Sequence, residues 1–151
     1  MTHAIPEYTV DQLEAAGRIE LDHFTSEDAF ELGTLAAAVT QEWGVSLSVD
    51  IVIDGYLVYR ARLGKTGPGN DPWLAGKAAV VEKFGEPSLL VRRRHEEAGT
   101  PFVDDETFKA HGGSMPIRVN GELVGTITTS GEPDVIDHTA TAEAVRRFLG
   151  R

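Results

Sequence analysis

The chain has 151 residues, no cysteine, and 24 acidic against 14 basic side chains, which gives a formal net charge of −10. The missing cysteines exclude disulfides, thiolate catalysis and zinc thiolate sites, and the acidic balance argues against a nucleic-acid partner, which needs a basic surface. No apolar run approaches the length of a transmembrane helix, and the N-terminus lacks the basic and apolar regions of a signal peptide. We therefore expect one cytoplasmic domain over residues 1–151, with no membrane partner.

The N-terminal third is predicted to form a helix, a strand and a longer helix. Thr9 and Gln12 have capping-box spacing, and Gly17 would end the helix that they begin. Residues 18–22 alternate strictly between polar and apolar side chains, which is typical of a strand with one solvated face. Thr25 or Ser26 then caps a helix that runs to Gly44. Its apolar stripe has the 3.6-residue period and includes Leu32, Leu35, Val39 and Trp43.

Two β-hairpins are predicted from their turn dipeptides, Asp54-Gly55 and Asn120-Gly121, because such turns favour positive φ. A two-residue turn also predicts the register. That register pairs Ile53 with Tyr56, Ile51 with Val58 and Val49 with Arg60 in the first hairpin, and Val119 with Glu122 and Ile117 with Val124 in the second. In the second hairpin, apolar residues then occupy both faces, with Ile117, Val119 and Val124 on one and Leu123 and Ile127 on the other. Both faces must therefore be covered.

The remaining elements are helical. Asp71 and Pro72 are predicted as the N-cap and first residue of a helix that ends at Gly85. A segment over residues 88–98 follows, then a short helical turn over 104–110 and a final helix over 133–149. Two hairpins and amphipathic helices together predict an α+β fold, with an antiparallel sheet of about five strands and helices that cover a sheet face.

Candidate binding residues fall into two groups. Trp73 and Lys77 are four residues apart and share one helix face, near Asn70. A tryptophan beside an ammonium suits a small planar or anionic ligand, although a core tryptophan with a packed lysine stem explains the same pattern. Among the five histidines, His111 precedes Gly112-Gly113 and could swing over a pocket, and His138 follows Asp137 on the apolar face of the last helix. A buried, merely hydrogen-bonded imidazole remains the alternative for His138.

One apparent nucleotide motif fails. Gly64-Lys65-Thr66 resembles the end of a P-loop, but the position that requires the first glycine is Tyr59. No nucleotide cofactor is therefore expected.

The order of several motifs is similar to that of the UPF0303 family, a branch of the haem-degrading (HbpS/GlcG-like) domain proteins. The matching residues are His111-Gly112-Gly113-x-x-Pro116-Ile117, then Gly125-Thr126-Ile127-Thr128-Thr129-Ser130-Gly131, then Asp137-His138, with further matches at 28–33, 64–73, Lys77 and Phe84-Gly85. The resemblance covers residues 7–149. It implies a profilin-like three-layer α-β-α arrangement, helices on both faces of the sheet, and the binding of haem or a related tetrapyrrole, with a part in its degradation.

The resemblance also implies a binding site. Its residues would be Asn70, Trp73, Lys77, His111, Gly112, Gly113, Asp137 and His138, with His138 or His111 as the haem-iron ligand and Lys77 as a propionate partner. The chain departs from the family where Glu86-Pro87 replaces a His-Ser pair. A non-catalytic oligomeric scaffold or partner-binding protein, or a small-anion-binding domain, therefore stays open as an alternative.

Charge is segregated along the chain. Residues 1–32 hold eight acidic side chains and one basic, whereas residues 58–94 hold eight basic and three acidic. Complementary segments of this kind favour a homo-oligomer, although solvated faces of opposite sign explain the pattern equally well.

Overall fold

The computed structural model describes residues 6–16 and 19–150. Its elements in chain order are α1 (Val10–Ala15), β1 (Ile19–Leu21), α2 (Ser26–Trp43), β2 (Ser48–Ile53), β3 (Tyr56–Arg62), a 3₁₀ turn (Pro68–Asn70), α3 (Asp71–Phe84), α4 (Ser88–Glu97), β4 (Ser114–Val119), β5 (Glu122–Ser130) and α5 (Asp134–Phe148). The strands form one sheet in the order β1-β4-β5-β2-β3. The predicted α+β fold is confirmed. The sheet is mixed rather than wholly antiparallel, because β1 runs parallel to β4.

The helix boundaries follow the predicted capping residues closely. Thr9 and Gln12 form the expected capping box at α1, and Thr25 forms one with Asp28 at α2. Gly44 ends α2 in the left-handed region, at φ 66°. The helix α3 begins one residue earlier than predicted, because the preceding 3₁₀ turn leads directly into it. Gly17 lies outside the described residues.

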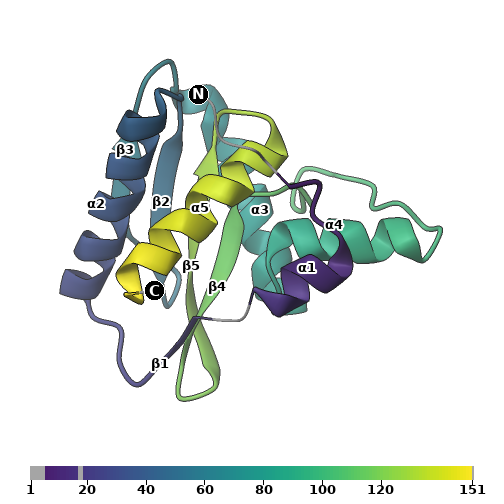
Figure 1. Cartoon of the computed structure of the whole chain (residues 1–151), viewed down its shortest axis with the longest axis horizontal. Coiled ribbons are helices and arrows are strands. Elements are labelled where there is room, and N and C mark those ends of the chain that lie inside the picture. Colours follow the sequence, from purple (N-terminus) through teal and green to yellow (C-terminus); the bar gives the residue numbers. More distant parts are fainter. Residues whose placement is uncertain (1–5, 17–18, 151) are drawn as a thin grey trace.

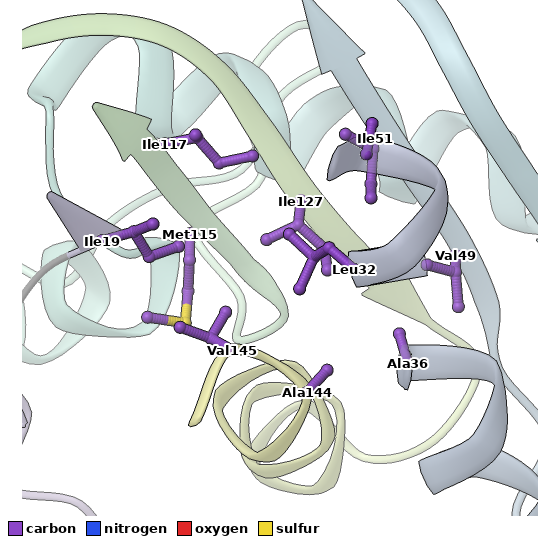
Figure 2. Close-up of a cluster of buried hydrophobic side chains, with 11 residues drawn as sticks. Ile19, Leu32, Ala36, Val49, Ile51, Met115, Ile117, Ile127, Ala144 and Val145 are labelled. Atoms are coloured by element: carbon purple, nitrogen blue, oxygen red, sulfur yellow. The ribbon is translucent and has the colours of Figure 1, made fainter. Parts of the chain in front are cut away.

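Helices lie on both faces of the sheet, as expected. In Figure 1, α2 and α5 lie side by side over one face, and α3 lies behind the other, while α1 and α4 pack together at the side. The main core fills the space between the sheet and the α2–α5 layer. Figure 2 shows its side chains, which include Ile19, Leu32, Val49, Ile51, Met115, Ile117, Ile127 and Val145. Within the described residues, no helix is both long and apolar enough to cross a membrane.

Both hairpins contain a register shift that the turn dipeptides did not predict. The pairs next to each turn are as expected, Ile53 with Tyr56 and Val119 with Glu122. Beyond the turn, each second strand carries one extra residue, so the other predicted pairs were wrong. Ile51 pairs with Tyr59, Val49 with Ala61, and Ile117 with Gly125. A β-bulge of this kind moves every later residue by one position and exchanges the faces.

The bulge in the second hairpin changes what the two sheet faces contain. Ile117 and Ile127 lie in the same core cluster, on the α2–α5 face, rather than on opposite faces. The face toward α3 carries hydroxyls instead, because residues that alternate with that core are buried serines and threonines: Ser48, Ser114, Thr126 and Thr128. The prediction of two apolar faces was therefore wrong, although helices do cover both.

The helical turn predicted over residues 104–110 is absent, and this segment is an irregular loop. The carboxylate of Asp105 accepts hydrogen bonds from the backbone N–H groups of Thr107 and Phe108, both at 2.7 Å. A short acidic side chain can satisfy the local backbone in this way without a helix, which explains the error.

Candidate functional site

A polar groove lies where the end of β5 meets the first turns of α3 and α5. Its cavity volume is about 290 Å³. We call it the His111 groove, and its lining residues are Asn70, Trp73, Lys77, His111, Ser130, Gly131, Glu132, Asp134 and Asp137. The structure therefore brings together five of the eight predicted site residues, and Gly112, Gly113 and His138 are outside the lining.

His111 forms one wall of the groove and is held from two sides. Its Nε2 contacts a carboxylate oxygen of Asp104, and its Nδ1 lies 3.0 Å from Nη1 of Arg92. The same Arg92 nitrogen donates to Asp134 at 2.6 Å, and the ring of Trp73 meets the imidazole edge-on at 5.3 Å. Burial alone would raise the pKa of Asp134, but the backbone N–H of Gly112 and the Arg92 guanidinium together lower it. Asp134 is therefore a carboxylate.

The floor of the groove contains a buried contact between a lysine and an aspartate. Nζ of Lys77 donates to Oδ2 of Asp137 at 2.8 Å and to the carbonyl oxygen of Thr129 at 2.9 Å. The two side chains are only 3% and 2% exposed. Burial lowers the pKa of Lys77 and raises the pKa of Asp137 to about 6, and the contact between them opposes both changes. The lysine is thus a group of the groove floor rather than a free surface cation.

Gly112 and Gly113 bring the loop of His111 against α5 and β5. A Cβ on Gly112 would lie 2.3 Å from the carbonyl oxygen of Asp134, and one on Gly113 would lie 2.3 Å from that of Thr129. Only glycine allows backbones to approach this closely. The pair therefore positions His111 instead of lining the groove.

His138 faces away from the groove. Its side chain is buried, its ring packs edge-on against Tyr8 at 4.8 Å, and its Nδ1 has no hydrogen-bond partner among the described residues. Burial lowers the pKa of His138 to about 4. Asp137 and His138 point in different directions from α5, as expected for neighbours on a helix. This imidazole is a neutral group of the core.

Sequence reasoning missed Asp104, Glu132 and Asp134 as members or supports of the site. Asp134 could have been found from the sequence, because it is the first residue of α5 and follows the end of β5 by only four residues. An acidic side chain at a helix N-terminus is stabilised by the helix dipole. Asp104 lies seven residues before His111 in the same loop, whereas the other partners come from α3, α4 and the start of α5, and no spacing in the sequence indicated them. Among residues 6–16 and 19–150, no group of three or more His, Asp or Glu side chains is placed to hold a metal ion.

The basic segment over residues 58–94 is largely neutralised inside the chain. Arg60 binds Asp50 through two hydrogen bonds at 2.7 and 2.8 Å, and Arg62 contacts Asp71 at 2.8 Å. Arg94 similarly contacts Glu86 at 2.7 Å. Asp50, Asp71 and Glu86 all lie outside the acidic segment over residues 1–32, so these pairs occupy basic side chains without joining the two segments.

The fold and the groove define a three-layer α+β protein with a polar site at the end of its sheet. Residues 24–146 match the family described as "Haem degrading protein HbpS-like". A UPF0303 protein of Streptomyces coelicolor is 39% identical, with 94% of each chain covered. The crystal structure of Ybr137w protein has a TM-score of 0.81 at 26% identity, covering 95% of this chain and 88% of the other. The PduOC:Heme complex has a TM-score of 0.68 at 19% identity, covering 81% and 92%, and shows a shared fold.

The chain belongs to the haem-degrading HbpS-like family, and its curated relatives are UPF0303 proteins. A haem-related function is thus established at the level of the family. The resemblance inferred from the ordered motifs is confirmed.

Proposed function

We propose that this protein binds haem or a related tetrapyrrole at the His111 groove and takes part in its degradation. The observation that carries the proposal is the imidazole of His111, held by Asp104 beside the ring of Trp73. A carboxylate on one ring nitrogen is the usual support of a metal-binding histidine, because it fixes the tautomer and raises the basicity of the other nitrogen. A solved relative of this fold is itself a haem complex.

The residues fit haem in part. Nδ1 of His111 is the candidate iron ligand, because Arg92, which now contacts it, already has a second partner in Asp134. Lys77 is committed to Asp137, so we assign a propionate group to Lys109, whose ammonium lies 5.3 Å from the Trp73 ring. When bound, haem supplies an iron centre that activates oxygen. The protein's residues hold the macrocycle and orient the imidazole.

A groove of about 290 Å³ is at the lower limit for small-molecule sites and cannot enclose a porphyrin. We therefore propose that the chain forms a cytoplasmic homo-oligomer in which a second copy covers what the groove leaves exposed. A separate feature favours self-association: the apolar side chains of Phe30 and Tyr56 are 66% and 75% exposed near the β3 edge.

Haem titration tests the binding proposal. The Soret band should shift and saturate near one haem per chain, and His111→Ala should weaken the affinity by at least about tenfold, which corresponds to one lost iron ligand of about 1.4 kcal/mol or more. His95→Ala is the matched control, since His95 lies outside the groove. A response that never saturates, or equal affinities for the two folded variants, would contradict the assignment.

Sedimentation at micromolar concentration tests the oligomer. Tyr56→Asp should dissociate it, whereas Val103→Asp, at an apolar residue that is 84% exposed on a distant loop, should not. A wild-type monomer at moderate salt would refute self-association.

A further inference from the structure

The amine of Lys77 has one position that no described residue occupies. The described residues offer this nitrogen two acceptors, the carbonyl oxygen of Thr129 and Oδ2 of Asp137. A protonated amine has three hydrogens to donate, whereas a neutral amine has two and a lone pair. These two contacts are compatible with either form, and they leave one position of the nitrogen for a molecule in the groove.

The burial of Lys77 and the carboxyl groups around it favour the neutral, nucleophilic form. The side chain is 3% exposed, and the acidic groups that act on it are Asp137 in direct contact and Asp134 at longer range. Taking two opposite charges out of water is costly even when they are paired. A proton passed from Lys77 to Asp137 across their 2.8 Å contact removes both charges from the groove floor. Burial lowers the pKa of Lys77 and raises that of Asp137, which is the direction that this transfer needs.

A small molecule can approach this amine from the groove. Lys77 and Asp137 belong to its lining together with Asn70, Trp73 and His111. The volume of about 290 Å³ suits a compact ligand of a few carbon atoms, and Trp73 gives it an aromatic wall. Burial that removes water from a lysine is one of the ways in which enzymes activate an amine as a nucleophile.

We propose that Lys77 forms a reversible imine with a small aldehyde or ketone bound in the His111 groove. The neutral amine attacks the carbonyl carbon, so that a C–N bond forms, and the carbonyl oxygen takes up the proton that Asp137 holds. The nitrogen then gives its extra proton back to the Asp137 carboxylate. The resulting carbinolamine loses its hydroxyl as water, with the proton supplied by Asp137, and the nitrogen returns its remaining proton to Asp137 as the C=N bond to Lys77 forms. One carbonyl compound and one amine thus give one imine and one water, and no oxidant or reductant is needed.

This activity is separate from haem binding, because it requires only the amine, its paired carboxylate and an open groove. It also predicts a competition, since a bound tetrapyrrole and a bound carbonyl compound would share the lining residues. The test therefore uses the full-length chain without haem, and its outcome does not depend on whether haem binds.

The experiment traps the imine by reduction. The folded chain is incubated at neutral pH with limiting butanal and sodium cyanoborohydride, which reduces an imine to a stable secondary amine. The label is then located by peptide mapping. The chain has only four lysines, Lys65, Lys77, Lys83 and Lys109, so each is measured in the same sample. An exposed lysine is neutral in roughly one molecule in a thousand at this pH, so Lys77 should be labelled at least about tenfold faster than the other three.

The unfolded chain is the matched control. In concentrated urea the four lysines should react at similar rates, because the preference depends on the folded environment. Omission of the reductant should leave no stable label, which separates an imine from other amine modifications. If Lys77 in the folded chain is labelled no faster than the other lysines, the ion pair is only structural and the proposal is overturned.

Discussion

The buried imidazole of His138 should make the stability of the protein depend on pH. Burial lowers its pKa to about 4 in the folded chain, against an ordinary value of 6.5. Between these values the unfolded chain binds more protons at this position than the folded chain does. Stability therefore falls as the pH drops from about 6.5 to about 4 and is fully present above 6.5. The difference between the two pKa values corresponds to about 3 kcal/mol of unfolding free energy, at 1.36 kcal/mol for each pKa unit.

His138→Gln removes this titration and keeps a polar side chain of similar size. We expect the difference in unfolding free energy between wild type and variant to shrink by about 3 kcal/mol as the pH is lowered from 7 to 4. With a urea m-value of about 1–3 kcal/mol/M, that is a change of about 1–3 M in the separation of the two midpoints. Urea denaturation at several pH values, followed by circular dichroism, measures it.

Other groups titrate in the same range, so only the difference between the two chains is informative. The pKa of Asp137 is raised to about 6, so its titration makes the folded chain less stable as the pH rises, opposite to the effect of His138. This contribution is the same in wild type and variant and therefore cancels in the comparison. His23→Gln is the matched control, because the His23 side chain is 69% exposed. A wild-type-minus-variant difference that stays constant from pH 7 to 4 would refute the assignment of His138 as a neutral core group.

Two further predictions concern the backbone. Gly125→Ala should lower the free energy of unfolding by about 1–3 kcal/mol, because its Cβ would lie 2.2 Å from the carbonyl oxygen of Val52, whereas Gly69→Ala, which meets nothing within 4 Å, should cost far less. Equal urea midpoints for these two variants would contradict the close approach of the strands. Thr25→Ala should cost about 1 kcal/mol, because it removes the acceptor for the backbone N–H of Asp28, and a thermal melt that matches wild type would count against that cap.

The fold was predictable where a few neighbouring residues decide the structure. Thr25 and Gly44 bound α2 as expected, and Asp54-Gly55 and Asn120-Gly121 form the turns. The bulges were not predictable, because an extra residue in a strand depends on its fit against the partner strand and not on the turn. One such bulge placed Ile117 and Ile127 on the same face, although the two-residue turn alone predicted opposite faces.

The sequence indicated several of the residues that line the groove, but not how these residues contact one another. Trp73, Lys77 and His111 do line one groove, although they come from distant parts of the chain. The sequence could not tell that Lys77 lies beneath the groove and contacts Asp137, since burial is a property of the assembled fold. The helical pattern correctly placed His138 on the buried, apolar face of α5. That pattern could not show whether a buried imidazole also reaches a ligand, and His138 does not line the groove.

The parallel pairing of β1 with β4 has a consequence for synthesis on the ribosome. Ile19 pairs with Ile117, 98 positions later in the chain. At elongation rates of about 5–20 residues per second, β1 must wait about 5–20 s for its partner strand to be made. The hairpin of β2 and β3 can close long before then, whereas Ile19 and the apolar side chains of α1 stay exposed to solvent. The acidic character of the first 32 residues would help to keep this waiting segment from aggregating, because like charges repel.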